Sequence, residues 1–209
     1  MMQFSAQGMT ELTKLVVRDP STAFAIVKAA RLPVPASVMM IALAGVIGGF
    51  TVGVLDVLTG TPDVVLEFDD GRTATVERAG PILQAIYATA TALALAVALL
   101  WVGRRLGGGG SAPEVLAAVA VLQLVMTVIL VAQAISAVLL PMLSLILMIF
   151  GLYVFLRGLA HAVNVVHDFN NLARSAGVIC LSFLGVIIGV MIAMAVFGLG
   201  PQATMLGEL

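Results

Sequence analysis

The stretch VLAAVAVLQLVMTVILVAQAISAVLLPMLSLILMIFGLYVFL, residues 115–156, runs for 42 residues without a charged side chain. A single helical crossing of the hydrocarbon layer takes about 20 residues, so this run is too long for one span and long enough for two. Pro141 is its only proline, and proline cannot continue a helix without losing a backbone hydrogen bond. The run therefore predicts two spans, 115–139 and 142–160, joined by a tight turn at Pro141.

The composition of the whole chain agrees with a lipid environment. Of its 209 residues, 61% are hydrophobic and 10% are charged, whereas soluble domains are about half apolar and a quarter charged. Three further apolar runs predict spans at 35–55, 82–102 and 176–199. The first run is too long for the apolar region of a signal peptide, so we expect it to remain as a span. The predicted fold is all-α, a polytopic membrane bundle of five transmembrane helices.

Basic residues give this bundle an orientation, because short cytoplasmic segments are enriched in Lys and Arg. With the N-terminus inside and the C-terminus outside, the inside segments hold eight of the ten basic residues: Lys14, Arg18, Lys28, Arg31, Arg104, Arg105, Arg157 and Arg174. A four-span alternative, with 115–156 as one helix, would place Arg157 and Arg174 opposite Arg104 and Arg105. The charge distribution favours five spans.

The outer loop, 56–79, contains VVLEFDDGRTATVER, in which apolar and polar residues alternate around Asp70-Gly71. Asp-Gly between alternating runs is a strong hairpin signal. We therefore expect a small extracytoplasmic β-hairpin.

Residues 1–33 form a cytoplasmic N-terminal segment, 34–200 the membrane domain and 201–209 a short outside tail. Asp19-Pro20 resembles a helix cap and first helical position, which predicts a short amphipathic helix at 20–31. That helix could lie on anionic lipid headgroups or pack on the bundle as a lid, and the sequence favours neither.

The stretch GRRLGGGGSAPE, residues 103–114, is glycine-rich enough to suggest a phosphate loop. A Walker loop requires Lys-Ser or Lys-Thr after its last glycine, and this stretch has neither. We interpret it as a connection in which Arg104 and Arg105 hold a span end in the headgroups and the glycines reverse the chain. Ser111 and Glu114 then form a capping box for the next helix.

Within the spans, all charged side chains can be placed at or beyond a span end, whereas transporters usually carry ionisable groups inside. Milder polar residues remain on the second and third spans: Gln84, Tyr87, Thr91, Gln123, Thr127 and Gln133. They either bond between helices or line a polar pathway. Small residues recur at four-residue spacing in Gly45, Gly49 and Gly53 and in Gly185 and Gly189, which predicts close helix packing. The two ridges either meet each other or serve self-association.

The most specific stretch is RGLAHAVNVVHDFNNLARSAG, 157–177. His161, Asn164, Asp168 and Asn171 would share one stripe if the helix continued, with His167 beside it. The two histidines are six residues apart, nearly on opposite helix faces, which argues against a metal site. We expect this segment to extend the fourth span and to bond loops or a partner.

Three features together resemble bacterial members of the Yip family, named for Ypt/Rab-interacting proteins: the five-span plan, the R-R-L-G-G-G-G-S connection leading into V-L-Q-L-V and a proline turn, and A-H-A-V-N-V-V-H-D-F-N-N-L-A-R-S. The resemblance covers about Arg18 to Leu199 and implies a compact five-helix membrane protein. Eukaryotic relatives bind Rab GTPases and act in trafficking. Their long cytosolic N-terminal region and D-L-Y-G-P-type motif are missing from this sequence, so that role is not carried over.

The sequence thus predicts a non-enzymatic protein of the bacterial inner membrane, a scaffold, adaptor or modulator of membrane organisation. We expect lipid and a membrane or cytoplasmic protein as partners, or self-association, and no nucleic acid, cofactor or metal. The predicted interaction surface comprises Arg104, Arg105, Arg157, His161, Asn164, His167, Asp168 and Asn171. The alternative is a small transporter or channel using the polar faces of spans two and three. A membrane enzyme would require His161, His167 and Asp168 to converge.

Overall fold

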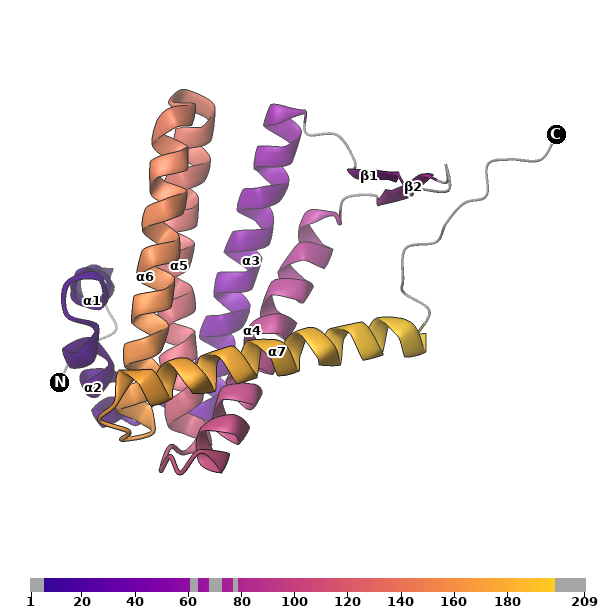
Figure 1. Cartoon of the computed structure of the whole chain (residues 1–209). Helices are drawn as coiled ribbons and strands as arrows, with labels where there is room; N and C mark the ends of the chain where they lie inside the picture. The colour runs from indigo at the N-terminus through magenta and orange to yellow at the C-terminus, as the bar shows by residue number, and fades with distance from the viewer. Residues whose placement is uncertain (1–5, 61–63, 68–72, 77–78, 198–209) are drawn as a thin grey trace.

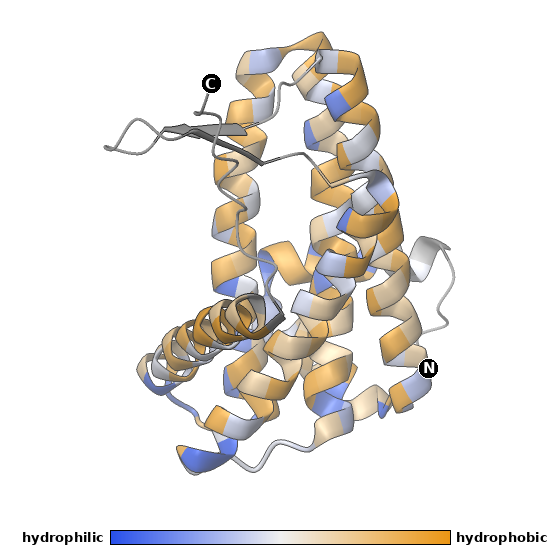
Figure 2. Cartoon of the chain, turned by 90° about the vertical axis from the view of Figure 1, so that its right-hand side faces the viewer, coloured by the Kyte–Doolittle hydropathy of each residue, from blue (hydrophilic) through white to orange (hydrophobic). Residues whose placement is uncertain are grey.

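The computed structural model describes residues 6–60, 64–67, 73–76 and 79–197 of the chain. Five helices in this part are long and apolar enough to cross a membrane. They are α3 (Val34–Thr59), α4 (Pro81–Arg105), α5 (Ala112–Leu139), α6 (Pro141–Val166) and α7 (Leu172–Phe197). The predicted all-α membrane bundle with five candidate spans is confirmed, and Figure 2 shows hydrophobic residues along most of the length of these helices.

The turn at Pro141 is as short as a turn between two helices can be. Leu140 alone separates α5 from α6, with φ −145°, and Pro141 takes the first position of α6. Proline suits that position because its missing N–H would have no helical partner there. The long uncharged run therefore folds back on itself, and α5 and α6 lie side by side (Figure 1).

Helices α3 and α4 approach closely along the first glycine ridge. A methyl group added at Gly49 would lie 2.6 Å from both the Pro81 carbonyl oxygen and the Ala85 nitrogen. Methyl groups at Gly45 and Gly53 would also overlap α4, at Thr89 and Pro81. The ridge therefore packs within the chain, but against α4. Of the two alternatives for the glycine ridges, the one in which this ridge meets Gly185 and Gly189 is wrong.

Helix α7 departs from the arrangement expected of a fifth upright span. It runs crosswise to α5 and α6 (Figure 1). Its first half buries Ser175, Val178, Ile179 and Ser182 in contact with α4 and α6. Methyl groups at Gly185 and Gly189 would meet no described atom within 4 Å. Because only the first half packs, neighbouring helices do not hold α7 parallel to them.

Two helices precede the spans, α1 (Ala6–Arg18) and α2 (Pro20–Ala30); α1 was not predicted. Asp19 caps α2, accepting hydrogen bonds from the Thr22 backbone nitrogen at 3.2 Å and the Thr22 hydroxyl at 2.6 Å. Ala23, Phe24 and Val27 are buried where α2 contacts α5 and α6. Helix α2 therefore packs on the bundle as a lid, the second of the two predicted alternatives, and does not lie free on lipid headgroups.

Two short strands lie between α3 and α4, β1 (Val64–Glu67) and β2 (Thr73–Val76). They pair antiparallel, with Val64 opposite Val76 and Glu67 opposite Thr73. The Asp70-Gly71 turn and the 201–209 tail lie outside the described residues. The side of the membrane on which the strands lie stays a prediction, as does the orientation of the termini.

We expect Gly49→Ala to destabilise the protein by about 1–3 kcal/mol, because the added methyl forces α3 and α4 apart. Thermal unfolding in detergent measures the loss. Gly185→Ala is the matched control, and its stability should be unchanged or slightly higher because alanine favours the helix. Equal losses at both positions would contradict the close α3–α4 contact.

Candidate functional site

Two connections meet at one end of the bundle. We call this the basal end, formed by α2, the α4–α5 connection (106–111) and the α6–α7 connection (167–171). Helix α4 closes with a Schellman motif, in which Gly108 N–H bonds to Gly103 O at 2.8 Å and Gly107, with φ +85°, occupies the left-handed position. Gly109 N–H then bonds to His167 O at 3.1 Å. The two connections are therefore joined through their backbones.

Helix α6 ends in the same way without a glycine. Phe169 N–H bonds to Asn164 O at 3.1 Å, and Asp168 takes the left-handed position with φ 53°. Asn170 is also left-handed, with φ 49°. Asp and Asn tolerate this conformation better than most residues. These two residues turn the chain at the basal end before α7 begins.

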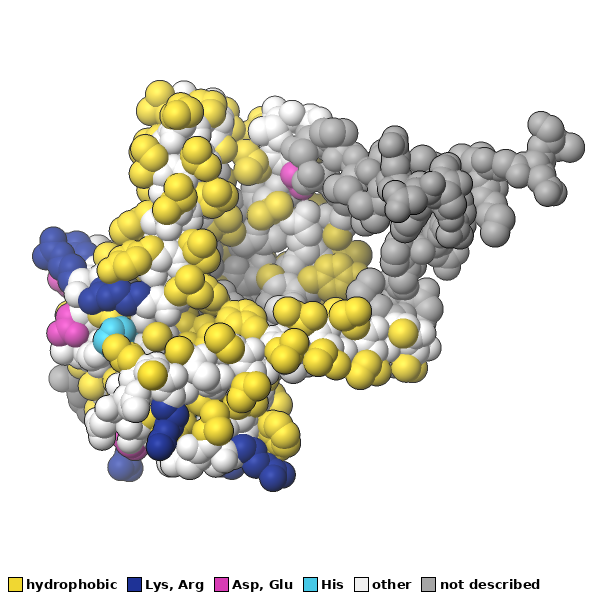
Figure 3. Space-filling model, viewed as in Figure 1, with side chains coloured by type: hydrophobic (Ala, Val, Ile, Leu, Met, Phe, Trp, Pro, Cys, Tyr) yellow, Lys and Arg dark blue, Asp and Glu magenta, His cyan; other side chains and the backbone are white. Residues whose placement is uncertain are grey.

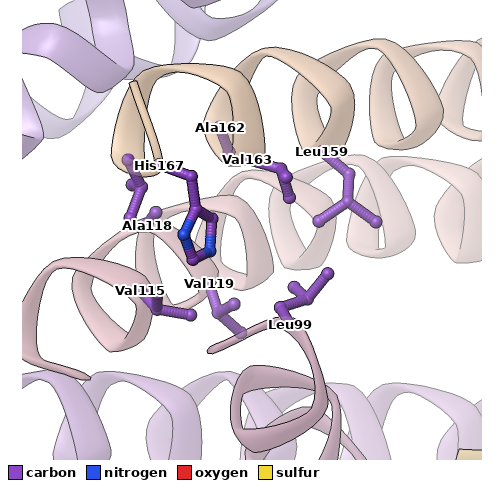
Figure 4. Close-up of a pocket in the computed structure, with 9 residues that line it drawn as sticks. Leu99, Val115, Ala118, Val119, Leu159, Ala162, Val163 and His167 are labelled. Carbon is purple, nitrogen blue, oxygen red and sulfur yellow. The ribbon is translucent and has the colours of Figure 1, made fainter. Parts of the chain in front are cut away.

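The imidazole of His167 fills the space between the two connections. Its side chain is 2% exposed. It points from the end of α6 towards Leu99, Val115 and Val119 (Figure 4).

Three glycines surround this ring, Gly103 from α4 and Gly108 and Gly110 from the connection. A methyl group at Gly108 would lie 2.5 Å from Nδ1 and one at Gly110 2.7 Å from Nδ1, while one at Gly103 would overlap the ring. The sequence predicts only a chain reversal for the glycine run. Two of its four glycines also admit His167, and only the fold brings that side chain near.

Neither ring nitrogen of His167 has a hydrogen-bond partner among the described residues. A small apolar cavity of about 10 Å³ adjoins the ring, close to the smallest space that holds one water. Burial lowers the pKa of His167 below its usual value of 6.5. The nearby Leu99 carbonyl opposes this pKa shift without completing a hydrogen bond, and the charges of Arg104 and Lys28 add to it. The Asp168 charge opposes the shift as well, but burial is the largest cause, so the fold disfavours the protonated form of this imidazole.

Helix α6 binds the N-terminal helices through its basal half. Arg157 donates to the carbonyl oxygens of Val17 at 2.7 Å and Arg18 at 3.3 Å, at the C-terminus of α1. His161 Nδ1 and the Ser21 hydroxyl share a hydrogen bond of 2.6 Å. These contacts hold the start of α2 and the end of α1 on α6.

Lys28 makes the third attachment. Here the cation lies on α2 and the carbonyl groups lie on α6. Its ammonium donates to the carbonyl oxygens of Val165 at 3.0 Å and Val166 at 3.3 Å and pairs with the Asp168 carboxylate at 2.7 Å. A cation at a helix C-terminus is favourable because the free carbonyls carry partial negative charge. Lys28 thus caps α6 from a different helix.

Two asparagines organise the start of α7. Asn164 Oδ1 accepts a hydrogen bond from Asn171 N–H at 2.9 Å. Asn171 Oδ1 in turn accepts from Ala173 N–H at 2.9 Å and Arg174 N–H at 3.3 Å, the cap of α7. The predicted continuous polar stripe is wrong in one respect, because α6 ends at Val166 and Asp168 lies in the turn.

The predicted interaction residues therefore separate into three groups. Arg104, Arg105, Asp168 and Asn171 are exposed. Arg157, His161 and Asn164 are half-buried in the contacts just described, which attach α1, α2 and the loop. His167 is not on the surface at all, because three glycines leave room for its ring inside.

Among the exposed residues, two arginines also have local partners. Arg104 Nε donates to Gly110 O at 3.1 Å. The Arg105 guanidinium lies 5.1 Å from the centre of the Trp101 ring, a cation–π distance. The roles of Lys28, Ser21 and Gly103 could not be predicted from the sequence, because their partners are far away in the chain.

The three side chains considered for an enzyme site have separate partners or surroundings. His161 bonds to Ser21, Asp168 pairs with Lys28, and His167 is enclosed by apolar groups and glycines. No group of three potential metal ligands occurs among the residues that the structure describes.

The polar faces of spans two and three do not form a joint pathway either. Gln84 Nε2 donates to the nearby Ala79 carbonyl at 2.7 Å, and Tyr87 is 56% exposed. Gln123, Thr127 and Gln133 instead face a separate cavity, to which α4 contributes only Ala88 and Ala92.

These features define a polytopic helical membrane protein with a polar, tightly joined basal end. The Yip1 domain family matches residues 14–196, and the chain belongs to this family. Searches of curated proteins and of solved structures gave no significant match.

We expect Gly108→Ala to cost about 1–3 kcal/mol of stability, because the methyl must displace the His167 ring. Gly109→Ala is the control, since its methyl would lie 4.0 Å from Asp168 Oδ2, an ordinary contact. Combining Gly108→Ala with His167→Ala should cost less than the sum of the single changes, measured by thermal unfolding. Strictly additive losses would show that the methyl and the ring do not collide.

Stability should also depend on pH through His167. Its pKa is lowered in the folded protein, so the unfolded chain takes up a proton first as the pH falls. The contribution of His167 to the free energy of unfolding is complete above about pH 6.5 and is lost as the pH falls below it. The free energy of unfolding then changes by at most about 1.4 kcal/mol per pH unit. Unfolding between about pH 5 and about pH 7.5 measures this, and His167→Gln should flatten the dependence. An unchanged profile in His167→Gln would assign the effect to another group.

Proposed function

We propose that this protein is a non-enzymatic scaffold or adaptor in membrane organisation, and that its basal end binds a membrane or cytoplasmic protein. The observation that supports this is the combination of charge and rigidity at that end. The backbone bond between the two connections and the attachments through Arg157, His161 and Lys28 fix its shape. A pre-organised surface loses less conformational entropy when a partner binds.

The charged groups exposed on this surface suit recognition of a polar partner. Figure 3 shows Lys and Arg side chains on the left and at the bottom of the molecule, around α1, α2 and the basal end, while the upper parts of the helices present hydrophobic side chains. Arg105 and Asp168 are exposed there and carry opposite charges. Charge complementarity at an interface chiefly gives specificity and fast association. Arg105, Asp168, Arg104 and Asn171 form the proposed contact surface.

The proposed location is the inner membrane of a bacterium, with the basal end facing the cytoplasm. The eight basic residues in the described part of the chain lie on α1, α2, α4, α6 and α7 or directly beside them. Arg157, the one deepest in its helix, reaches the end of α1. The positive-inside rule supports this orientation, and the Ala-, Val- and Gly-rich composition supports a bacterial source.

Affinity purification from mildly solubilised native membranes tests the proposal. In the variant Arg105→Gln/Asp168→Asn, we expect recovery of a stoichiometric partner to fall about fivefold to tenfold, because both exposed charges are lost. Asn is chosen at 168 because it tolerates the left-handed backbone.

The matched control is Glu11→Gln/Lys14→Gln, which also removes one charge of each sign, from an exposed pair on α1. Its recovery of the partner should equal that of the wild type. Equal loss in both variants, or none in either, would contradict the proposed surface. Solute movement by the purified protein in liposomes, abolished by Asp168→Ala, would replace the scaffold function with transport.

A further inference from the structure

A cavity of about 280 Å³ lies near the middle of helices α3 to α6. It is distinct from the basal end and from the small space beside His167. Apolar cavities of about 150 Å³ are large enough to bind benzene, so this one has room for a larger guest. Its wall includes Gly48 from α3, Ala92 from α4, Gln123 and Gln133 from α5, and Gly151 from α6.

Small residues keep this space open where helix packing does not require them. A methyl group at Gly48 would lie 3.6 Å from a Leu130 methyl, an ordinary contact. Glycine inside a helix is destabilising relative to alanine, because it loses more backbone freedom on folding. Gly49, the next residue, is explained by its contact with α4. The contact at Gly48 leaves room for a side chain, and what glycine preserves there is the cavity.

Two side-chain amides face the cavity without a partner. Among the described residues, neither Gln123 nor Gln133 has a hydrogen bond from its amide group, although both are half-buried. The Thr127 hydroxyl between them is satisfied by the Gln123 carbonyl at 2.8 Å. An amide without a partner in an apolar setting is destabilising, and hydrocarbon offers no hydrogen-bond partner. A molecule in the cavity that carries hydrogen-bonding groups would supply the partner that the surrounding helices do not.

The wall also limits the charge and shape of what binds. No charged side chain is among the residues that line this cavity, and a charge at mid-membrane is costly without one. Gln123 and Gln133 are ten residues apart on one helix, which places them about 15 Å apart along its axis. Met126 and Met148 give an adaptable apolar surface. An elongated, uncharged molecule with hydrogen-bonding groups fits these limits.

We propose that this cavity binds an uncharged single-chain amphiphile, of the monoacylglycerol type, whose hydroxyl or ester group bonds to the Gln123 or Gln133 amide. The amide oxygen accepts from a hydroxyl, and the amide nitrogen donates to an ester carbonyl. The acyl chain lies along the methionines and small residues. This goes beyond the proposed scaffold function and does not depend on it.

Photo-crosslinking in lipid nanodiscs tests the site with three probes of one chain length, each carrying a diazirine in the chain: monodecanoylglycerol, decanoate and decane. Labelling of the wild type by the glycerol ester should be saturable, should map to α5 and α6, and should exceed labelling by the other two at least fivefold. Gln123→Leu/Gln133→Leu should remove this preference. Gln84→Leu, which changes an amide bonded elsewhere, should keep it.

A second variant separates the ligand from the fold. Gly48→Val narrows the cavity without the collision expected at Gly49, so its labelling should fall at least fivefold while its unfolding temperature stays equal or rises. Equal labelling by the ester and by decane would mean an ordinary lipid crevice and would overturn the proposal. Retained preference in the double glutamine variant would overturn it as well. Capture of a protein partner at the basal end is unaffected by either result.

Discussion

The close contact between the His167 ring and three glycines is the constraint on which the basal end depends. The ring occupies the space where α4 ends, α5 begins and α6 ends, so it sets how near the two connections can come. Their nearness allows Gly109 to bond to the His167 carbonyl. The same nearness of the two connections fixes the turn that contains Asp168, and Asp168 pairs with Lys28 from this turn. The attachment of α2 therefore depends indirectly on the absence of a side chain at Gly103, Gly108 and Gly110, which leaves room for the His167 ring.

Much of the fold was predictable because its signals are local. A 42-residue apolar run with one proline requires two helices, and the structure turns at Leu140. The Glu114 half of the capping box is present, since its carboxylate accepts from Ser111 N–H at 2.9 Å. Such features depend on neighbours a few residues away. Hydrophobic length and helix-end chemistry are therefore readable from the chain alone.

The site was harder to predict because its contacts are long-range. Periodicity placed His167 beside a polar stripe, but the left-handed turn at Asp168 ends that helix. The glycine run identified a reversal, whereas its contact with an imidazole 57 to 59 residues further along the chain could not be derived from spacing. The crosswise α7 likewise begins just after a turn at Asp168 and Asn170, both in the left-handed region. No repeat in the sequence encodes that direction.

The attachment of the N-terminal helices has a consequence for biosynthesis. Ser21 bonds to a residue 140 positions later, and Lys28 and the end of α1 bond to residues 137 to 140 positions away. Chains grow at about 5–20 residues per second, so these partners are made roughly 7 to 28 seconds after α2. During that interval Phe24 and Val27, buried in the finished protein, have no α6 to cover them. Helices α1 and α2 are thus made well before the partners that hold them, and their apolar face stays uncovered by α6 for a period set by the rate of synthesis.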